Sequence, residues 1–341
     1  MDNITHSLTG LAMSRAGLNR LSPHATLLLL LSANAPDADV IVALKGSLAY
    51  FEAHRGYSHS LLCLPLTSLL PVLLVAALYR QRLPWLKAWL LCGIGVASHL
   101  LIDWTNNYGV RLLLPFSSRW FHLDWTSLYD GCLMAVLVFA AVWPGFARLV
   151  SREIGERPSA GRGVARFALA FFILFDCARG VLHLRAVAQL ESRLYNDSPA
   201  VQAAALPDPF NPLRWTGVVE TAADFRLLAV SPLQQFDSDD VRHRYFKPPE
   251  SPAIVNAKAT ERFRYFVYFA RFPVWAEWPV TVDRRPGTRI ELTDLRFGIP
   301  GAGSFHCVAL ENSANQVLGT WFTYGSAEDV GWGDTGPPAA H

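Results

Sequence analysis

The sequence predicts an all-α membrane helical bundle followed by a small β-rich C-terminal domain. The 341 residues are 51% hydrophobic and 17% charged, with a mean hydropathy of +0.21, which is more apolar than an ordinary soluble enzyme. Four apolar stretches approach the roughly 20 residues that a helix needs to cross a bilayer. After about Asn196 the apolar runs become short, and prolines and aromatic residues become frequent.

Charge and cysteine usage narrow the class of protein. The formal net charge of +2 gives no basic surface for nucleic acid, so the expected partners are the lipid bilayer and small molecules. Four of the five cysteines lie in apolar runs, namely Cys63, Cys92, Cys132 and Cys177, and Cys307 is isolated far downstream. Neither a disulfide framework nor a cysteine-based zinc motif is indicated. The opening residues lack the features of a signal peptide, so Met1 to His6 are expected to remain in the mature protein.

The predicted membrane helices lie in the first half of the chain. They cover residues 60–79, 85–102, 132–150 and 164–184. Two shorter helical segments, 5–20 and 23–35, suit a tilted or partly inserted hairpin. Residues 1–190 are therefore expected to form one membrane-embedded domain.

Basic residues in the short loops predict the orientation. Arg80, Arg82 and Lys87 lie in one loop. A second loop and its flanks contain Arg148, Arg152, Arg157, Arg162 and Arg166. Because cytoplasmic loops carry excess Lys and Arg, both loops are expected in the cytoplasm. The polar cluster described below and the C-terminal domain are then extracytoplasmic.

The C-terminal region is predicted as a β-rich soluble domain over residues 196–330, with a flexible tail at 331–341. Strand-like runs are expected at residues 262–272, 279–283, 288–297, 305–310 and 316–324. The sequence identifies no partner for this domain.

The most informative polar pair is His99 and Asp103, at the end of the predicted 85–102 helix. A spacing of four places both side chains on one helical face, where they can bind one metal ion or merely hydrogen-bond. Ionisable groups at bilayer depth are costly and usually functional, which favours ligation.

Two further motifs supply carboxylates and imidazoles. His54 and His59 can both point inward only if Gly56 interrupts the helix between them, and either histidine could instead form only structural hydrogen bonds. Asp37 and Asp39 follow Pro36 in a predicted turn, where they could bridge two metals or be held by Arg55, and one of them could instead cap a helix.

Other candidates lie near the ends of the same helices. His6 falls on the cluster's side of the membrane by the orientation argument. Asp130 either caps the next helix or ligates, and Asp124 is a candidate general base. Arg111 and Arg119 are candidate anion clamps or snorkelling juxtamembrane residues, and Arg55 lies within the histidine motif. His24 and His122 are assigned structural roles.

A polar stripe interrupts the last predicted membrane helix. Asp176, Arg179 and His183 are spaced three and four residues apart, so they share one face. The pattern favours a structural ion pair over an arginine that faces substrate.

Together the motifs resemble the YdjM-like family of inner-membrane metal-dependent hydrolases. The likeness covers roughly the first 185 residues and is carried by Asp2 to His6, Pro36 to Asp39, His54 to Leu62, and Ser98 to Asp103 with Thr105 and Gly109. That family is similar to the zinc-dependent phospholipase C and P1-nuclease group. The resemblance implies a phospholipase C/P1-nuclease-like helical fold that holds zinc. It also implies His99 and Asp103 as the helix pair, with His6, Asp37 and His59 as further ligands. The soluble enzymes have more histidines after the pair, so one or two ions are expected here.

These observations predict a membrane-bound metal-dependent hydrolase. The metal ligands are expected among His6, Asp37, His54, His59, His99, Asp103 and Asp130. Asp39, Asp124, Arg55 and Arg111 are the catalytic candidates, with Asp39 or Asp124 as base or as the group that orients a ligand histidine. The expected cofactor is a divalent metal, zinc first, and the expected substrate is a phosphoester of a lipid or lipid-linked molecule. A non-catalytic metal or ion transporter, or a regulatory scaffold, is the alternative.

Overall fold

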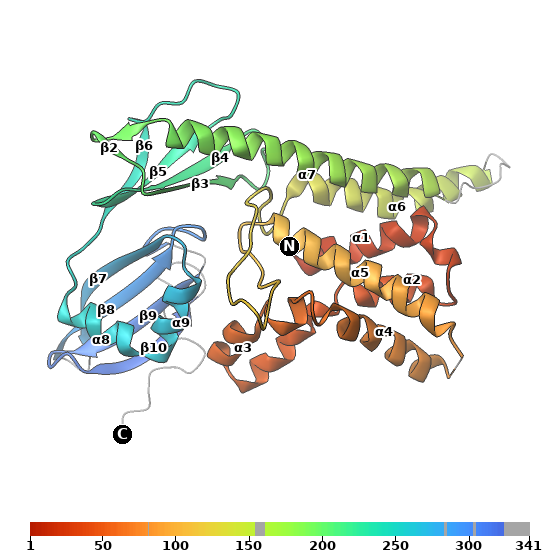
Figure 1. Ribbon diagram of the computed structural model, residues 1–341, viewed down its shortest axis with the longest axis horizontal. Helices are drawn as coiled ribbons and strands as arrows, with labels where there is room; N and C mark the ends of the chain where they lie inside the picture. The colour runs from red at the N-terminus through yellow and green to blue at the C-terminus, as the bar shows by residue number, and fades with distance from the viewer. Residues whose placement is uncertain (81, 154–160, 283–284, 303–304, 324–341) are drawn as a thin grey trace. The chain divides into compact units, whose positions relative to one another are not determined.

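The structure is a computed structural model that describes residues 1–341 except 81, 154–160, 283–284, 303–304 and 324–341 (Figure 1). It divides into two compact units, of which the first contains Met1–Arg185 with Leu206–Trp215 and the second Ala186–Ala205 with Thr216–His341. The first unit is helical and contains the candidate spans, and the second contains the β-sheets. The predicted order of a helical membrane region and a β-rich region is confirmed. The predicted tail at 331–341 lies outside the described residues.

A helical hairpin opens the first unit, as predicted. It consists of α1 (Asn3–Ala16) and α2 (Ala25–Ser32). The Asp2 carboxylate caps α1 by accepting the backbone N–H groups of Ile4 and Thr5. Gly17 ends α1 at a φ of 141°, a conformation that side chains with a Cβ rarely adopt. The chain can therefore reverse at once and pack α2 against α1.

Three helices are long and apolar enough to cross a membrane: α5 (Trp85–Thr105), α6 (Gly131–Glu153) and α7 (Arg162–Glu191). The fourth predicted span is shorter than expected, because α4 (Leu64–Tyr79) has 16 residues. It passes the same test only together with Ser47–His59, from which it bends by 93°. A second bent pair, Ala25–Ser32 with Pro36–Lys45, meets at 52°, so the described chain has three to five candidate spans.

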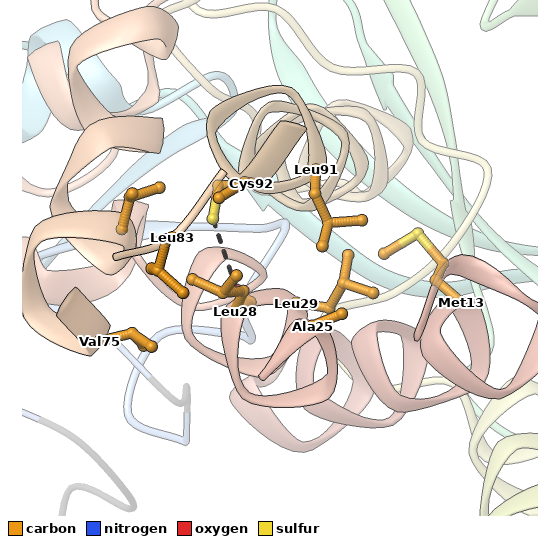
Figure 2. Packing of buried hydrophobic residues seen from close by; sticks show 10 residues of the cluster. Met13, Ala25, Leu28, Leu29, Val75, Leu83, Leu91 and Cys92 are labelled. Carbon is orange, nitrogen blue, oxygen red and sulfur yellow. Dashed lines mark hydrogen bonds between the residues drawn. The ribbon is translucent and has the colours of Figure 1, made fainter. Parts of the chain in front are cut away.

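Buried apolar side chains join α1, α2, α4 and α5 into one core (Figure 2). Leu28 and Leu29 of α2 are completely buried, and Cys92 of α5 packs over Leu28. Gly95 lets α5 approach α2 closely, since a Cβ there would lie 1.9 Å from Ser32 Oγ. This close crossing fixes the part of α5 that carries the predicted helix pair.

Short helices replace the turn predicted between α2 and α4. They are the 3-10 helix η2 (Pro36–Lys45), α3 (Ser47–Ala53) and the 3-10 helix η3 (Tyr57–His59). The predicted interruption at Gly56 is confirmed, because α3 ends before it and η3 begins after it. A Cβ on Gly56 would lie 2.6 Å from Ala53 O, so the tight bend requires glycine.

The second unit contains two four-stranded sheets in which consecutive strands are neighbours. The first sheet consists of β3 (Gln202–Pro207), β4 (Trp215–Glu220), β5 (Asp224–Val230) and β6 (Val241–Phe246). The second consists of β7 (Pro273–Val282), β8 (Arg285–Asp294), β9 (His306–Asn312) and β10 (Val317–Thr323). A two-stranded ribbon of β1 (Leu194–Tyr195) and β2 (Ser198–Pro199) precedes them. The sequence predicts a β-rich region over β3 to β6 but no individual strands there.

One predicted strand is wrong, because residues 262–272 mostly form α9 (Glu261–Phe269), which follows α8 (Pro252–Ala259). The aromatic content suggested a strand, whereas Phe263, Phe266 and Phe269 recur at helical spacing and are all buried. Phe266 packs on Phe305 and Phe322 of the second sheet region. Tertiary packing on this face overrides the β-propensity of the aromatic residues. The other four predicted runs overlap β7 to β10, although 279–283 covers only the last part of β7 and 288–297 extends beyond the end of β8.

Arg179 of the polar stripe in α7 has structural partners, but the ion pair with Asp176 that the sequence favoured does not form among the described residues, where Asp176 Oδ1 lacks a hydrogen-bond partner. Arg179 is 1% exposed and donates to the carbonyl oxygens of Trp125, Asp208 and Asn211. Its guanidinium lies 4.5 Å from the ring centre of Trp215. Arg179 therefore ties Leu206–Trp215 to α7 within the first unit.

Candidate metal centre

Four side chains that are far apart in the sequence meet beside the end of α5. Asp37 comes from η2, His59 from η3, and His99 and Asp103 from α5. Each offers one nitrogen or oxygen, and these atoms all lie within 4.8 Å of one another. His59, His99 and Asp103 have no exposed side-chain surface, and Asp37 is 13% exposed. The group is thus buried, with Asp37 at its accessible edge.

Five of the six separations between the donor atoms lie between 3.1 and 3.6 Å. His59 Nε2 lies 3.1 Å from His99 Nε2, 3.3 Å from Asp37 Oδ1 and 3.5 Å from Asp103 Oδ2. His99 Nε2 lies 3.6 Å from Asp37 Oδ1 and 3.4 Å from Asp103 Oδ2. Ligands at zinc bond lengths of about 2.0–2.1 Å in a tetrahedron are about 3.3 Å apart. The two imidazoles and two carboxylates therefore have the spacing of a four-ligand set.

Hydrogen bonds outside the cluster orient both imidazoles. His99 Nδ1 donates to Ala33 O over 2.7 Å, which leaves the lone pair of Nε2 directed into the cluster. His59 Nδ1 lies 2.9 Å from Ser58 Oγ and 3.6 Å from Asp39 Oδ2, and Ser58 Oγ itself donates to Asp39 Oδ2. Such outer partners fix the ring orientation of metal-binding histidines.

Cationic and amide groups surround the Asp103 carboxylate. Arg55 Nη2 lies 3.2 Å from Asp103 Oδ1, and Asn106 Nδ2 donates to the same oxygen over 3.2 Å. The Met1 amino group also contacts Oδ1. Arg55 is held in turn by Asn106 Oδ1 and Gly109 O. These contacts hold Oδ1 and leave the other oxygen, Oδ2, beside the two histidines.

Several buried polar atoms of the cluster have no partner with hydrogen-bond geometry among the described residues. They are Asp103 Oδ2 and both ring nitrogens of His6. His6 Nε2 lies 3.4 Å from Asp103 Oδ1, and its ring stacks on His99 with centroids 3.8 Å apart. Buried polar atoms are almost always satisfied, so these atoms and the donor spacing fit a bound cation.

A second group shares one carboxylate with the first. Asp37, Asp39 and His54 also offer atoms that lie within 4.8 Å of one another. His54 Nδ1 lies 3.1 Å from Asp39 Oδ1, while Asp39 Oδ2 accepts the backbone N–H of Arg55. A carboxylate between two donor groups can bridge two ions, so the geometry can accommodate one ion or two.

Three other candidates from the sequence have their own structural partners. Asp130 Oδ1 accepts the N–H groups of Cys132 and Leu133 and so caps α6. Arg111 donates to the carbonyl oxygens of Glu52 and His54 and lies over the ring of Trp120, which braces the end of α3. Asp124 Oδ1 lies 3.1 Å from His122 Nδ1. None of the three belongs to either donor group.

Sequence reasoning missed Asn106, which organises the cluster from the end of α5. Its side chain is completely buried, donates to Asp103, and accepts from Arg55 and from the N–H groups of Tyr108 and Gly109. Asn106 follows Asp103 by three residues, which is a helical neighbour spacing. That spacing was the signal that could have identified it.

The family match to known proteins covers the helical unit rather than the β-rich one. The YdjM inner membrane protein family matches residues 1–186. An uncharacterized protein of Bacillus subtilis (strain 168), YfhP, is 30% identical over 156 residues, which is 42% of this chain and 46% of that protein. The chain thus matches about half the length of this curated relative. No solved structure shows a significant match.

The matched range contains every residue of both donor groups and ends within α7. A family match over more than half of the chain, together with candidate membrane spans in the same range, establishes the relationship. The chain belongs to the YdjM inner membrane protein family.

Proposed function

We propose that this protein is a membrane-bound, metal-dependent hydrolase that cleaves a phosphoester of a lipid or lipid-linked substrate. The observation that carries the proposal is the convergence of donor atoms from Asp37, His59, His99 and Asp103, which all lie within 4.8 Å of one another in a largely buried group. Imidazole nitrogens and carboxylate oxygens are the ligands of zinc in hydrolytic sites. A divalent cation that bound there and kept one position open for water would supply a nucleophilic water near neutral pH and polarise a phosphoryl oxygen.

The residues around the cluster support specific roles. Asp37 is its most accessible ligand and belongs to both donor groups, so substrate or water would approach beside it. Asp39 and Ser58 hold the His59 ring, which makes Asp39 a positioning residue. Arg55 fixes Asp103 and contributes positive charge that attracts a phosphoester anion. His6 is a further ligand candidate beside Asp103.

The location suggests the class of substrate. His99 and Asp103 lie in the last turns of a candidate membrane span, so the cluster would lie near a membrane boundary. A lipid-borne headgroup reaches such a place by lateral diffusion in the bilayer. The basic loops support an extracytoplasmic position for the cluster, in the inner membrane of a bacterium.

The test is metal analysis of the detergent-purified full chain, followed by hydrolysis assays on nitrophenyl phosphoesters. We expect zinc to be retained, and Asp103→Asn and His99→Gln to lower zinc content and hydrolysis together, because each removes a ligand atom. The control is His24→Gln, whose ring stacks on Tyr79 outside both donor groups.

Zinc content below about a tenth of an equivalent after reconstitution would refute the metal site. Full zinc loading without hydrolysis of phosphomonoesters or phosphodiesters would refute the hydrolase and favour transport or a scaffold role. Equal metal loss in the His24 variant would show that the cluster variants act only through misfolding.

A further inference from the structure

A crevice separates parts of α1, α5 and α7 in the helical unit. Its volume is 420 Å³, within the roughly 300–1,000 Å³ typical of ligand pockets. The walls are mainly apolar and include Met13 of α1, Leu101 and Ile102 of α5, and Phe172 and Ile173 of α7. An occupant of this crevice must therefore be largely hydrocarbon.

The walls belong to elements that would lie in the bilayer. Both α5 and α7 are candidate spans. Leu101 and Ile173 line the crevice and are 57% and 65% exposed, so they form its outer rim. In a membrane such a rim faces lipid chains, which makes a chain from the bilayer the available occupant.

The crevice is lined by α1 and α5, the two helices that also carry His6, His99 and Asp103 of the cluster. Ile102 directly precedes Asp103, and Thr9 follows His6 by three residues, about 4.5 Å along α1. Thr105 also lines the crevice, two residues beyond Asp103. A molecule whose headgroup reached the cluster would thus have its chain beside these walls.

One wall residue distinguishes the crevice from a simple packing gap. Asp176 is 8% exposed, and its Oδ1 has no hydrogen-bond partner among the described residues. A carboxylate at this depth is costly and is usually retained for function. A hydroxyl or amide N–H near the head of a lipid chain would satisfy it.

We infer that the α1–α5–α7 crevice binds the hydrocarbon chain of the phosphoester substrate. This inference rests on the proposed function, and it adds that the substrate is a lipid whose chain is recognised inside the helical unit. The chain enters between α5 and α7 from the bilayer, while the phosphoester lies at the metal centre.

The test fills the crevice from either wall with tryptophan. Ile173→Trp and Leu101→Trp occupy it from α7 and α5. The matched controls are Leu174→Trp and Leu90→Trp, which add the same ring to the same helices at positions of similar exposure outside the lining. Each full-length variant is assayed on a water-soluble nitrophenyl phosphoester and on the same phosphoester joined to a long alkyl chain.

We expect both filling variants to lower turnover of the long-chain substrate by about tenfold or more, while hydrolysis of the soluble substrate stays within about twofold. A diazirine-labelled long-chain phosphoester should crosslink to Ser98–Thr105 and Leu169–Cys177 in zinc-loaded protein, and less so in the filling variants. A label on a phosphate-free lipid of equal chain length should crosslink more weakly there.

Equal effects in filling and control variants, or equal crosslinking of the phosphate-free lipid, would overturn the inference. Hydrolysis of the soluble substrate would still support the proposed function in that case. Conversely, selective crosslinking without hydrolysis of any phosphoester would refute the proposed function while showing a chain-binding crevice.

Discussion

At the scale of single residues, Asn106 connects three parts of the metal centre. Its amide donates to the Asp103 carboxylate and accepts from Arg55 and two backbone N–H groups. The side chain has no exposed surface, and its contacts with Asp103, Arg55 and the Gly109 N–H are buried. The loop after α5 therefore depends on the same amide that positions Asp103.

We predict that Asn106→Ala weakens both the fold and metal binding. The change leaves Arg55 and the amides of Tyr108 and Gly109 without their acceptor, which costs about 1–3 kcal/mol for each unsatisfied group that water cannot reach. Loss of an outer partner should weaken zinc affinity by about 10–100-fold. Thermal unfolding and zinc titration measure the two effects. Asn19→Ala, an exposed position, is the control, and equal losses there would contradict this role.

A second buried residue, Glu291, is expected to make the folding stability of the β-rich unit depend on pH. Glu291 is fully buried and contacts His306 Nδ1, the N–H of Gly301 and Arg289 Nη2 over 2.8, 2.8 and 2.9 Å. Burial alone would raise the pKa of Glu291, but the hydrogen bonds and the positive charge of Arg289 outweigh it and lower that pKa below 4.5. The ionised form is thus favoured by folding.

The sign of the pH effect follows from that lowered pKa. The stability contributed by Glu291 is fully present above its unfolded pKa and is lost as the pH falls through the lower folded pKa. We predict that Glu291→Gln lowers the unfolding temperature of the β-rich unit at pH 7, and that the difference from wild type shrinks below pH 4.5. Glu191→Gln, an exposed position, should show no such convergence. A pH-independent difference would contradict the linkage.

At the scale of elements, the crossing of α2 and α5 positions His99. Ala33, directly after α2, accepts the His99 Nδ1 proton, and Gly95 lies one turn before His99 on α5. A Cβ on Gly95 would collide with Ser32 at 1.9 Å from Oγ and 2.9 Å from Cβ. The close packing of α2 against α5 therefore requires glycine at position 95.

We predict that Gly95→Ala destabilises the helical unit and lowers zinc content, because α2 must move away and take Ala33 O from His99. Gly93→Ala is the matched control, since its Cβ would meet only Ser68 Oγ at 3.9 Å. Alanine is better than glycine inside a helix by about 1 kcal/mol, so Gly93→Ala should be neutral or stabilising. Unfolding in detergent and metal analysis would reveal the contrast, and identical behaviour of the two variants would refute it.

At the scale of the whole molecule, three candidate spans are enough to predict on which side of the membrane each connection lies. If α5 begins in the cytoplasm beside Arg80, Arg82 and Lys87, then α6 returns to it and α7 leaves it again. The end of α5, with the metal centre, and the β-rich unit then lie on the extracytoplasmic side. Bent pairs before α5 do not alter this expectation, because it starts from the basic loop directly before α5.

We predict that a cysteine at Ser118 in the connection from α5 to α6 reacts with a membrane-impermeant maleimide added to intact cells. A cysteine at Ser159, which lies outside the described residues, should react only after the membrane is opened. Both are placed in a chain whose native cysteines are replaced, and that parent chain serves as the unlabelled control. The reverse pattern of labelling would place the metal centre in the cytoplasm.

The sequence by itself determined the order of the two regions, three full-length candidate spans and the identity of the polar motifs. Span length and hydropathy are local properties, because a bilayer requires a continuous apolar segment of fixed length. The His99 and Asp103 pair was also local, since helical periodicity alone places two side chains four residues apart on one face. The aromatic run that forms α9 shows the limit of such local reasoning. Its composition favoured a strand, but the helical spacing of its buried phenylalanines decided the structure.

Only the tertiary structure decided which polar residues meet. His59 reaches His99 across 40 residues because Gly56 bends the chain and Gly95 brings α2 close to α5. Asp130 was equally plausible as a ligand, yet its carboxylate satisfies the free N–H groups at the start of α6. The same packing leaves the crevice beside α7 and the unpartnered oxygen of Asp176. Contacts of this kind depend on how helix surfaces fit one another in three dimensions, which local patterns do not encode.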